Sequence, residues 1–188
     1  MKMKMILTVL LSLLFILETQ AQTTHKVGTV TFDDDVTLYG QKAVYNGGAI
    51  RKKYFFKLYS IGLYLPAKTN NAQKAIDEDG FCAVRLIITS SMVTREKFIE
   101  TVTEGFATSS EGKASKAEID QLMGYFSEEF KDGDNILLAY KPDSGIEVWK
   151  NRKHLGSVKG LEFKKALFGI WLGKTPADAD VKKGMLGN

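Results

Sequence analysis

The segment between Gly47 and Pro66 constrains the fold of this chain more than any other. It opens on two glycines, carries a single arginine, Arg51, within an apolar frame, and continues as a long aromatic stretch. Glycine and asparagine are typical of turns, whereas aromatic and β-branched side chains are typical of strands. The pattern therefore predicts a turn at residues 46–48 and a strand over residues 54–65.

The neighbouring segments have the same strand-like composition. Residues 27–32 and 36–45 are rich in β-branched and aromatic side chains, and the three consecutive aspartates at 33–35 that separate them favour a turn. Residues 81–89 form a nearly continuous apolar run, as expected for a central strand that is covered on both faces. We therefore expect a sheet, to which the aromatic residues 54–56 also supply apolar surface.

Helical patterns begin after the first strands. We expect a short helix over residues 72–77 and a longer one for which Thr94 is the N-cap. A capping box formed by Ser115 and Glu118 predicts a second long helix, and the aspartate and glycine at 132–133 are expected to stop it. Both long helices carry apolar side chains at helical spacing, which indicates that one face of each packs into a core.

The last third of the chain predicts a hairpin and two more helices. Residues 136–140 and 146–149 are apolar segments on either side of a turn, and residues 163–171 have apolar side chains at helical spacing. Pro176 is expected at the first position of a final short helix. Strands followed by a helix pair, a hairpin and further helices indicate an α+β protein, with one domain over residues 22–188.

Residues 1–21 have the organisation of a signal peptide. Lys2 and Lys4 give a basic start, residues 5–17 are apolar, and a small-residue exit ends at Ala21, after which we expect cleavage. The apolar run is shorter than the roughly 20 residues that span a bilayer as a helix. We therefore expect an exported protein, periplasmic or secreted, without a stable membrane anchor.

Composition argues against several classes of function. The chain has a net charge of +4, and removal of residues 1–21 leaves +3, which is too small to indicate a nucleic-acid partner. Cys82 is the sole cysteine, and His25 and His154 are the only histidines, so neither a disulfide framework nor a metal site is expected. The glycines at 47–48 lack the later glycine and the following helix of a phosphate loop. We expect no cofactor and a monomeric protein.

Two polar residues in the aromatic segment are candidates for binding an anion. Arg51 held against an apolar cleft would bind a carboxylate or phenolate strongly, although it is equally compatible with a surface cation beside Lys52 and Lys53. The phenol of Tyr59 is suited to donate a hydrogen bond to a carboxylate. In the alternative interpretation, Tyr59 lies at the edge of the core with its hydroxyl in water. On one straight strand their Cα atoms would lie about 26 Å apart. Joint contact with one ligand therefore requires the chain to turn near Lys52 and Lys53.

Two blocks of the sequence resemble the chalcone isomerase family. They are residues 47–66 and, near the other end, residues 166–173 with the sequence ALFGIWLG. The resemblance implies an open-faced antiparallel sheet with helices layered on one face and a ligand cleft between them. In the true isomerases an arginine at the glycine-rich segment holds the substrate anion, and Arg51 is its match. At Tyr59 the isomerases have threonine, whereas fatty-acid-binding members of the fold have tyrosine.

The other polar residues of the isomerases are absent from this sequence. Thr94 stands where the isomerases have their catalytic tyrosine, Thr101 where they have asparagine, and Ile170 where they have threonine or serine. The resemblance therefore implies a non-catalytic protein that binds a fatty acid or another apolar carboxylate, a lipid-like ligand. Arg51 and Tyr59 would hold its head group, and the three replaced positions would surround it.

Two other functions stay open at this stage. An intramolecular lyase acting on a substrate other than chalcone would use Arg51 to stabilise an oxyanion and Tyr59 to donate a proton. A scaffold with a filled cleft would instead bind a protein partner. For a ligand-binding cleft, the expected wall residues are Phe56, Leu63, Leu86, Ile88, Phe98, Val102, Phe126 and Trp171.

Overall fold

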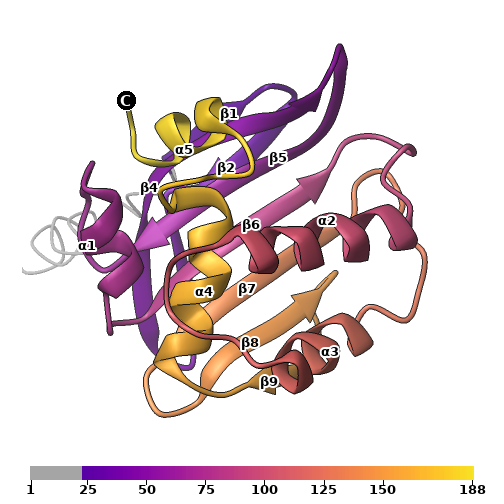
Figure 1. Ribbon diagram of the computed structural model, residues 1–188. Coiled ribbons are helices and arrows are strands. Elements are labelled where there is room, and N and C mark those ends of the chain that lie inside the picture. The colour runs from indigo at the N-terminus through magenta and orange to yellow at the C-terminus, as the bar shows by residue number, and fades with distance from the viewer. Residues whose placement is uncertain (1–22) are drawn as a thin grey trace, which may run out of the picture.

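The computed structural model describes residues 23–188, which form nine strands and five helices (Figure 1). The strands are β1 (Thr24–Val27), β2 (Val30–Asp33), β3 (Asp35–Leu38), β4 (Gln41–Lys53), β5 (Phe56–Leu65), β6 (Cys82–Ile88), β7 (Asn135–Lys141), β8 (Gly145–Lys150) and β9 (Lys153–Val158). The helices are α1 (Ala72–Asp77), α2 (Arg95–Thr108), α3 (Lys116–Gly124), α4 (Leu161–Leu172) and α5 (Ala179–Met185). The expected signal peptide lies outside the described residues.

The main sheet is a seven-stranded antiparallel meander. Its strands lie side by side in sequence order from β3 to β9, whereas β1 and β2 form a separate hairpin. Helices α2, α3 and α4 lie over one face of the sheet in Figure 1. The α+β class and the layered antiparallel architecture expected from the sequence are therefore confirmed.

Each face of the sheet contributes to a different core. Alternate residues of a strand point to opposite faces, so Leu63 joins the core beneath the helices while Tyr64 joins a smaller core that includes the β1–β2 hairpin. Strand β6 lies at the centre of the sheet and contributes Val84 to the first core and Ala83 to the second. The prediction of a central strand covered on both faces is confirmed.

The glycines at 47–48 do not form the predicted turn. Strand β4 continues through them with a bulge at Asn46, which is the extra residue between two consecutive strand pairs. A Cβ atom on Gly47 would clash with the backbone carbonyl oxygen of Gly184 in α5, and one on Gly48 would lie 2.6 Å from the carbonyl oxygen of Ile61. The glycines therefore permit a close approach of other backbone segments to β4.

Strand β5 begins at Phe56, two residues later than the start at residue 54 that the aromatic pattern predicted. Lys53 pairs with Phe56 across β4 and β5, so Tyr54 and Phe55 form the turn. The expectation that residues 54–56 supply apolar surface to the sheet is wrong, because these side chains are 85%, 98% and 52% exposed. The turn near Lys52 and Lys53 that joint contact required is confirmed.

Other boundaries also differ from the predictions. The segments 27–32 and 36–45 are each broken by a turn, at Gly28 with φ +65° and at Gly40 with φ +75°. These backbone conformations favour glycine. Strand β9 was not predicted, because its sequence KHLGSV lacks an apolar pattern.

Two helices begin or end away from their expected positions. Helix α3 ends at Gly124 rather than at 132–133, and Phe126 and Phe130 then pack against Phe98 from a non-helical segment. Helix α5 begins after Asp178, which is its N-cap, so Pro176 does not occupy the first helical position. The predicted bounds of α1, the Thr94 N-cap and the Ser115–Glu118 capping box are all confirmed.

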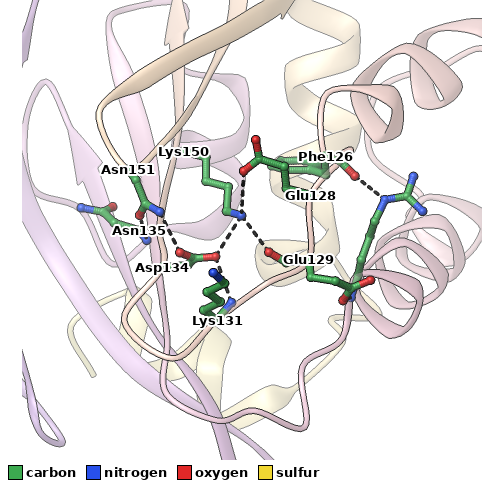
Figure 2. Close-up of polar contacts among 9 residues, drawn as sticks. Phe126, Glu128, Glu129, Lys131, Asp134, Asn135, Lys150 and Asn151 are labelled. Carbon is green, nitrogen blue, oxygen red and sulfur yellow. Dashed lines mark hydrogen bonds and ion pairs between the residues drawn. The ribbon is translucent and has the colours of Figure 1, made fainter.

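A buried polar cluster fixes the segment between α3 and β7 (Figure 2). Lys150 Nζ lies 3.0 Å from Asp134 Oδ2 and donates a hydrogen bond to the Glu129 carbonyl oxygen. Arg95, the first residue of α2, donates from its backbone N–H to the Glu129 carboxylate and from Nε to the Phe126 carbonyl oxygen. The segment therefore links the sheet to the first turn of α2, the helix that forms one wall of the site described next.

Candidate ligand-binding site

A cavity of about 380 Å³ lies between the β4–β5 hairpin and helices α2 and α4. Its buried or half-buried walls are almost entirely apolar, and they comprise Leu58, Leu86, Val93, Phe98, Val102, Ile170, Trp171 and Ala177. Its exposed rim is mixed in character, and it comprises Lys53, Tyr54, Phe56, Met92, Lys97, Glu100, Thr101 and Glu104. The half-buried Arg51 and the buried Tyr59 are the two polar residues that line the cavity inside this rim.

The strand pairing brings Arg51 and Tyr59 together. They are direct partners across β4 and β5, and residues directly opposite each other point to the same face of a sheet. A bulge follows, because Leu58 is an extra residue between this pair and the next one, Lys52 with Lys57. A bulge interrupts the alternation of faces, which explains how the consecutive residues Leu58 and Tyr59 both line the cavity.

Arg51 is held in place from behind. Its Nη1 donates to Asp178 Oδ2 at 2.6 Å and to the Lys52 carbonyl oxygen at 3.0 Å. The other oxygen of Asp178 accepts hydrogen bonds from the backbone N–H groups of Asp180 and Val181, as the N-cap of α5. Arg51 lines the cavity, whereas Asp178 does not. The carboxylate therefore orients the guanidinium, which excludes the alternative of a free surface cation.

Arg51 retains donors for a ligand. Its hydrogen bonds to Asp178 and to the Lys52 carbonyl oxygen both use Nη1, so neither partner occupies Nε or Nη2. A guanidinium has five N–H donors in a planar fork, which matches the two oxygens of a carboxylate. The side of the guanidinium away from Asp178 is therefore chemically suited to an anionic head group.

Tyr59 is buried with its hydroxyl beside an indole. Trp171 Nε1 donates a hydrogen bond of 3.2 Å to the Tyr59 hydroxyl oxygen. Burial raises the pKa of Tyr59, and the Trp171 hydrogen bond and the charge of Arg51 offset this rise in part. The phenol therefore stays neutral, with its oxygen accepting from Trp171 and its proton free to be donated to an acceptor in the cavity.

Charged groups of both signs surround the cavity. Lys53 and Lys97 on the rim are accompanied by Glu100 and Glu104, while Asp178 neutralises Arg51. The long-range field is thus nearly balanced, and attraction of an anion depends on short hydrogen bonds. Within residues 23–188 there is no cluster of three side chains able to hold a metal ion.

The structure brings together four of the five residues predicted for the ligand site. Arg51, Tyr59, Thr101 and Ile170 line the cavity. Thr94 does not, because its hydroxyl accepts a hydrogen bond from the Lys97 backbone N–H as the N-cap of α2. Among the expected wall residues, those on the cavity are Phe56, Leu86, Phe98, Val102 and Trp171. The remaining three, Leu63, Ile88 and Phe126, belong to the surrounding core.

Sequence reasoning missed two contributions to the site. The first is Asp178, whose role is hidden in the sequence because Pro176 predicts an earlier start of the last helix. Aspartate is a preferred N-cap, and this preference is the signal that points to Asp178. The second is Trp171, which was expected as an apolar wall and also donates a hydrogen bond to Tyr59.

Comparison with known proteins agrees with this fold. The family model described as chalcone isomerase-like matches residues 24–187. Among solved structures, a fatty-acid binding protein of Arabidopsis thaliana superposes with a TM-score of 0.65 at 17% sequence identity, over 84% of this chain and 91% of that chain. At this identity the likeness establishes the fold alone. No curated protein matches the sequence.

Proposed function

Because this chain belongs to the chalcone isomerase-like family, we propose that its cavity binds a fatty acid or another apolar carboxylate without changing it chemically. The observation that carries the proposal is the pairing of Arg51 with Tyr59 at the polar end of an apolar cavity. Ligand sites are typically concave, mostly apolar and equipped with a few convergent polar groups. The fatty-acid binding protein with the same fold supports the ligand class.

The proposed head-group contacts follow from the free donors. The neutral Tyr59 hydroxyl donates to one carboxylate oxygen, while the unused N–H groups of Arg51 donate to the other. Trp171 restrains the tyrosine and Asp178 restrains the arginine. Restraint of both groups before binding lowers the entropy lost on binding. The hydrocarbon tail then lies against the apolar wall formed by α2 and α4.

The pKa of Tyr59 favours binding over proton transfer. An intramolecular lyase would use Tyr59 as a general acid, and such a group works best when its pKa lies near the operating pH. Burial shifts the pKa of Tyr59 in the opposite direction, above its ordinary value of 10.0. A weakly acidic phenol remains a good hydrogen-bond donor to a carboxylate, so the same shift is compatible with ligand binding.

Native mass spectrometry of the purified protein and titration with a fluorescent fatty acid test this proposal. We expect a co-purified lipid mass and saturable binding that weakens in Arg51→Ala. Assays with chalcone should show no turnover above background. Unaltered fatty-acid affinity in Arg51→Ala, or turnover of chalcone that depends on Arg51, would contradict non-catalytic binding at this site.

We also propose that the protein is exported and cleaved after Ala21. The support is the basic start, the short apolar run and the small-residue exit of residues 1–21. Within residues 23–188 no helix has the length and apolar character needed to cross a membrane. Cell fractionation and mass analysis of the N-terminus test the proposal, and an intact chain retained in the cytoplasm would refute it.

A further inference from the structure

The tip of the β4–β5 hairpin carries an unusual exposed sequence. Residues 52–57 read KKYFFK, and all six are exposed. Phe55, at the turn itself, is almost fully exposed, and Tyr54 and Phe56 flank it. Figure 1 shows this hairpin projecting beyond the rest of the sheet at the upper right of the view. Three aromatic rings and three lysines therefore stand together at one extremity of the molecule.

The local structure of this tip works against stability. Two-residue hairpin turns favour glycine or asparagine because they require positive φ, yet Tyr54 occupies such a position with φ +56°. Lys52 and Lys57 are direct cross-strand partners, and like charges directly opposite each other are destabilising. Within residues 23–188, none of the lysines at 52, 53 and 57 takes part in an ion pair. Departures from local preference without a compensating contact are expected at functional sites.

We propose that this tip docks on the surface of a lipid bilayer that contains anionic lipids. Aromatic side chains partition into the interface between head groups and acyl chains, and Phe55 is placed to enter it first. Lysines beside the aromatic rings are attracted by the negative surface potential of such a bilayer. The combination of exposed rings with a local excess of positive charge matches this surface on both counts.

The lysines argue for a bilayer rather than a protein partner. Protein–protein interfaces are enriched in tyrosine and phenylalanine but depleted in lysine. At the tip, lysines make up half of the exposed residues from 52 to 57. Long flexible ammonium side chains suit a fluid layer of head groups, which has no fixed geometry to match.

Docking would place the mouth of the cavity against the lipid. Lys53, Tyr54 and Phe56 belong to both the tip and the rim of the cavity, and the partly exposed Met92 lies on the same rim. If the cavity holds a fatty acid, as proposed above, this arrangement allows the ligand to exchange with the bilayer without crossing water. Docking itself does not depend on that ligand.

Vesicle sedimentation with the purified protein tests the docking. The probes are vesicles of phosphatidylcholine alone and of equal parts phosphatidylcholine and phosphatidylglycerol, in buffer without fatty acid. The test variants are Phe55→Ser and the double change Lys52→Gln with Lys57→Gln, because these three residues do not line the cavity. The matched control for Phe55→Ser is Tyr39→Ser, since Tyr39 is also an exposed aromatic residue in a turn and lies between β3 and β4, at the end of β4 away from the tip.

We expect the wild type and Tyr39→Ser to bind the anionic vesicles alike, and to bind less as salt is raised. Phe55→Ser should bind about tenfold more weakly, because an aromatic ring no longer enters the interface. The double lysine variant should bind about 25-fold more weakly, since each lysine near an anionic surface contributes about fivefold. Thermal melts should show that all variants remain folded.

Three outcomes would overturn the docking proposal. The first is failure of the wild type to bind the anionic vesicles, and the second is unchanged binding by both tip variants. The third is a wild-type dimer in sedimentation that Phe55→Ser dissociates, which would assign the tip to a second copy of the chain. Titration of a fluorescent fatty acid in vesicle-free buffer tests the cavity separately, and Phe55→Ser should leave that affinity unchanged.

Discussion

The two faces of the sheet carry similar groups of tyrosine, arginine and aspartate. On the cavity face, Arg51 pairs with Asp178 and lies opposite Tyr59. On the other face, Arg85 Nη1 lies 2.8 Å from Asp33 Oδ2. There, the Tyr64 hydroxyl donates to the Asp33 carbonyl oxygen. Burial raises the pKa of both tyrosines, and the nearby arginine opposes the rise in each case.

The two groups differ in the placement of the aspartate and in the wall that surrounds them. Asp178 lies outside the cavity, so one side of Arg51 faces an apolar space. Asp33 instead lines the same hollow as Arg85, of about 310 Å³, whose wall combines the polar residues Asp35, Asn135 and Arg152 with the apolar residues Val36, Leu38, Leu137 and Trp149. An arginine–aspartate pair therefore becomes a candidate binding site for an apolar carboxylate when the aspartate lies outside the cavity and the arginine faces its apolar walls.

For the stability of the fold, the largest effect is expected from Gly47→Ala, because Gly47 packs against α5 and Asp178 at the start of that helix supports Arg51. The added methyl group would clash with the backbone of α5, the helix that Asp178 caps, and overpacking of this kind costs about 1–3 kcal/mol. Chemical denaturation should show this loss of unfolding free energy. Gly124→Ala is the control, because no atom from beyond its own helix backbone and its chain neighbours lies within 4 Å of the added Cβ. Equal stability of the two variants would show that α5 does not require glycine at position 47.

Removal of the arginine should affect ligand affinity on the cavity face, in Arg51→Ala, far more than on the other face. Hydrogen bonds to a charged group contribute about 1.5–3 kcal/mol, so fatty-acid affinity should fall about ten- to a hundredfold. Arg85→Ala, which also breaks an arginine–aspartate pair, should leave the affinity near that of the wild type. Titration of a fluorescent fatty acid measures both. Similar losses in the two variants would remove the distinction between the faces.

Tyr59→Phe should weaken binding less than Arg51→Ala. It removes one neutral hydrogen bond, of about 0.5–1.5 kcal/mol, and keeps the ring, so a loss of about two- to tenfold is expected. Tyr64→Phe is the matched control on the other face. The same titration decides the order, and a greater loss in Tyr59→Phe than in Arg51→Ala would transfer the main role to the phenol.

Asp178→Asn should strengthen binding by about threefold. It removes a negative charge that competes with the ligand carboxylate for Arg51, and at an effective dielectric constant near 20 the attraction between two charges in contact amounts to about 4 kcal/mol. Most of this gain is offset, because the guanidinium is less firmly oriented without the Asp178 charge. Asparagine remains a good N-cap, so α5 should stay folded. Asp33→Asn should not change the affinity. Weaker binding by Asp178→Asn would show that orientation of Arg51 outweighs charge competition.

The tyrosines of the two faces should behave most alike in the dependence of stability on alkaline pH. Burial raises the pKa of both tyrosines above the ordinary value of 10.0 in the folded state. The unfolded chain therefore releases these protons first, and stability should fall as the pH rises above about 10. Tyr59→Phe and Tyr64→Phe should each lose less stability than the wild type over this range. Stability measured by denaturation between about pH 8 and 11 checks this, and identical slopes in all three proteins would refute it.

Local features of the structure could be predicted because their causes lie within a few residues. The Thr94 cap and the Ser115–Glu118 capping box each depend on one helical turn. The apolar run at 81–89 also predicted its central place correctly, because burial on both faces leaves no polar alternation. Arg51 and Tyr59 were identified as candidates from residue type and from the family resemblance.

Long-range features could not be predicted in the same way. The turn expected at Gly47 was wrong because the reason for glycine there is α5, more than 100 residues further along the chain. Exposure of residues 54–56 was missed because aromatic composition indicates a strand without indicating whether another element covers it. Thr94 was assigned to the ligand site as well as to a helix cap, and only its cap role has a contact in the structure.

The sequence by itself determined the α+β class, most of the helix starts and the residue types at the polar end of the cavity. Tertiary structure alone decided that Asp178, 127 residues from Arg51, holds the guanidinium from behind. It also decided that Trp171, 112 residues from Tyr59, holds the phenol. The physical reason is that caps and apolar periodicity depend on neighbours along the chain. The environment of a charge depends instead on which distant segments exclude water from it.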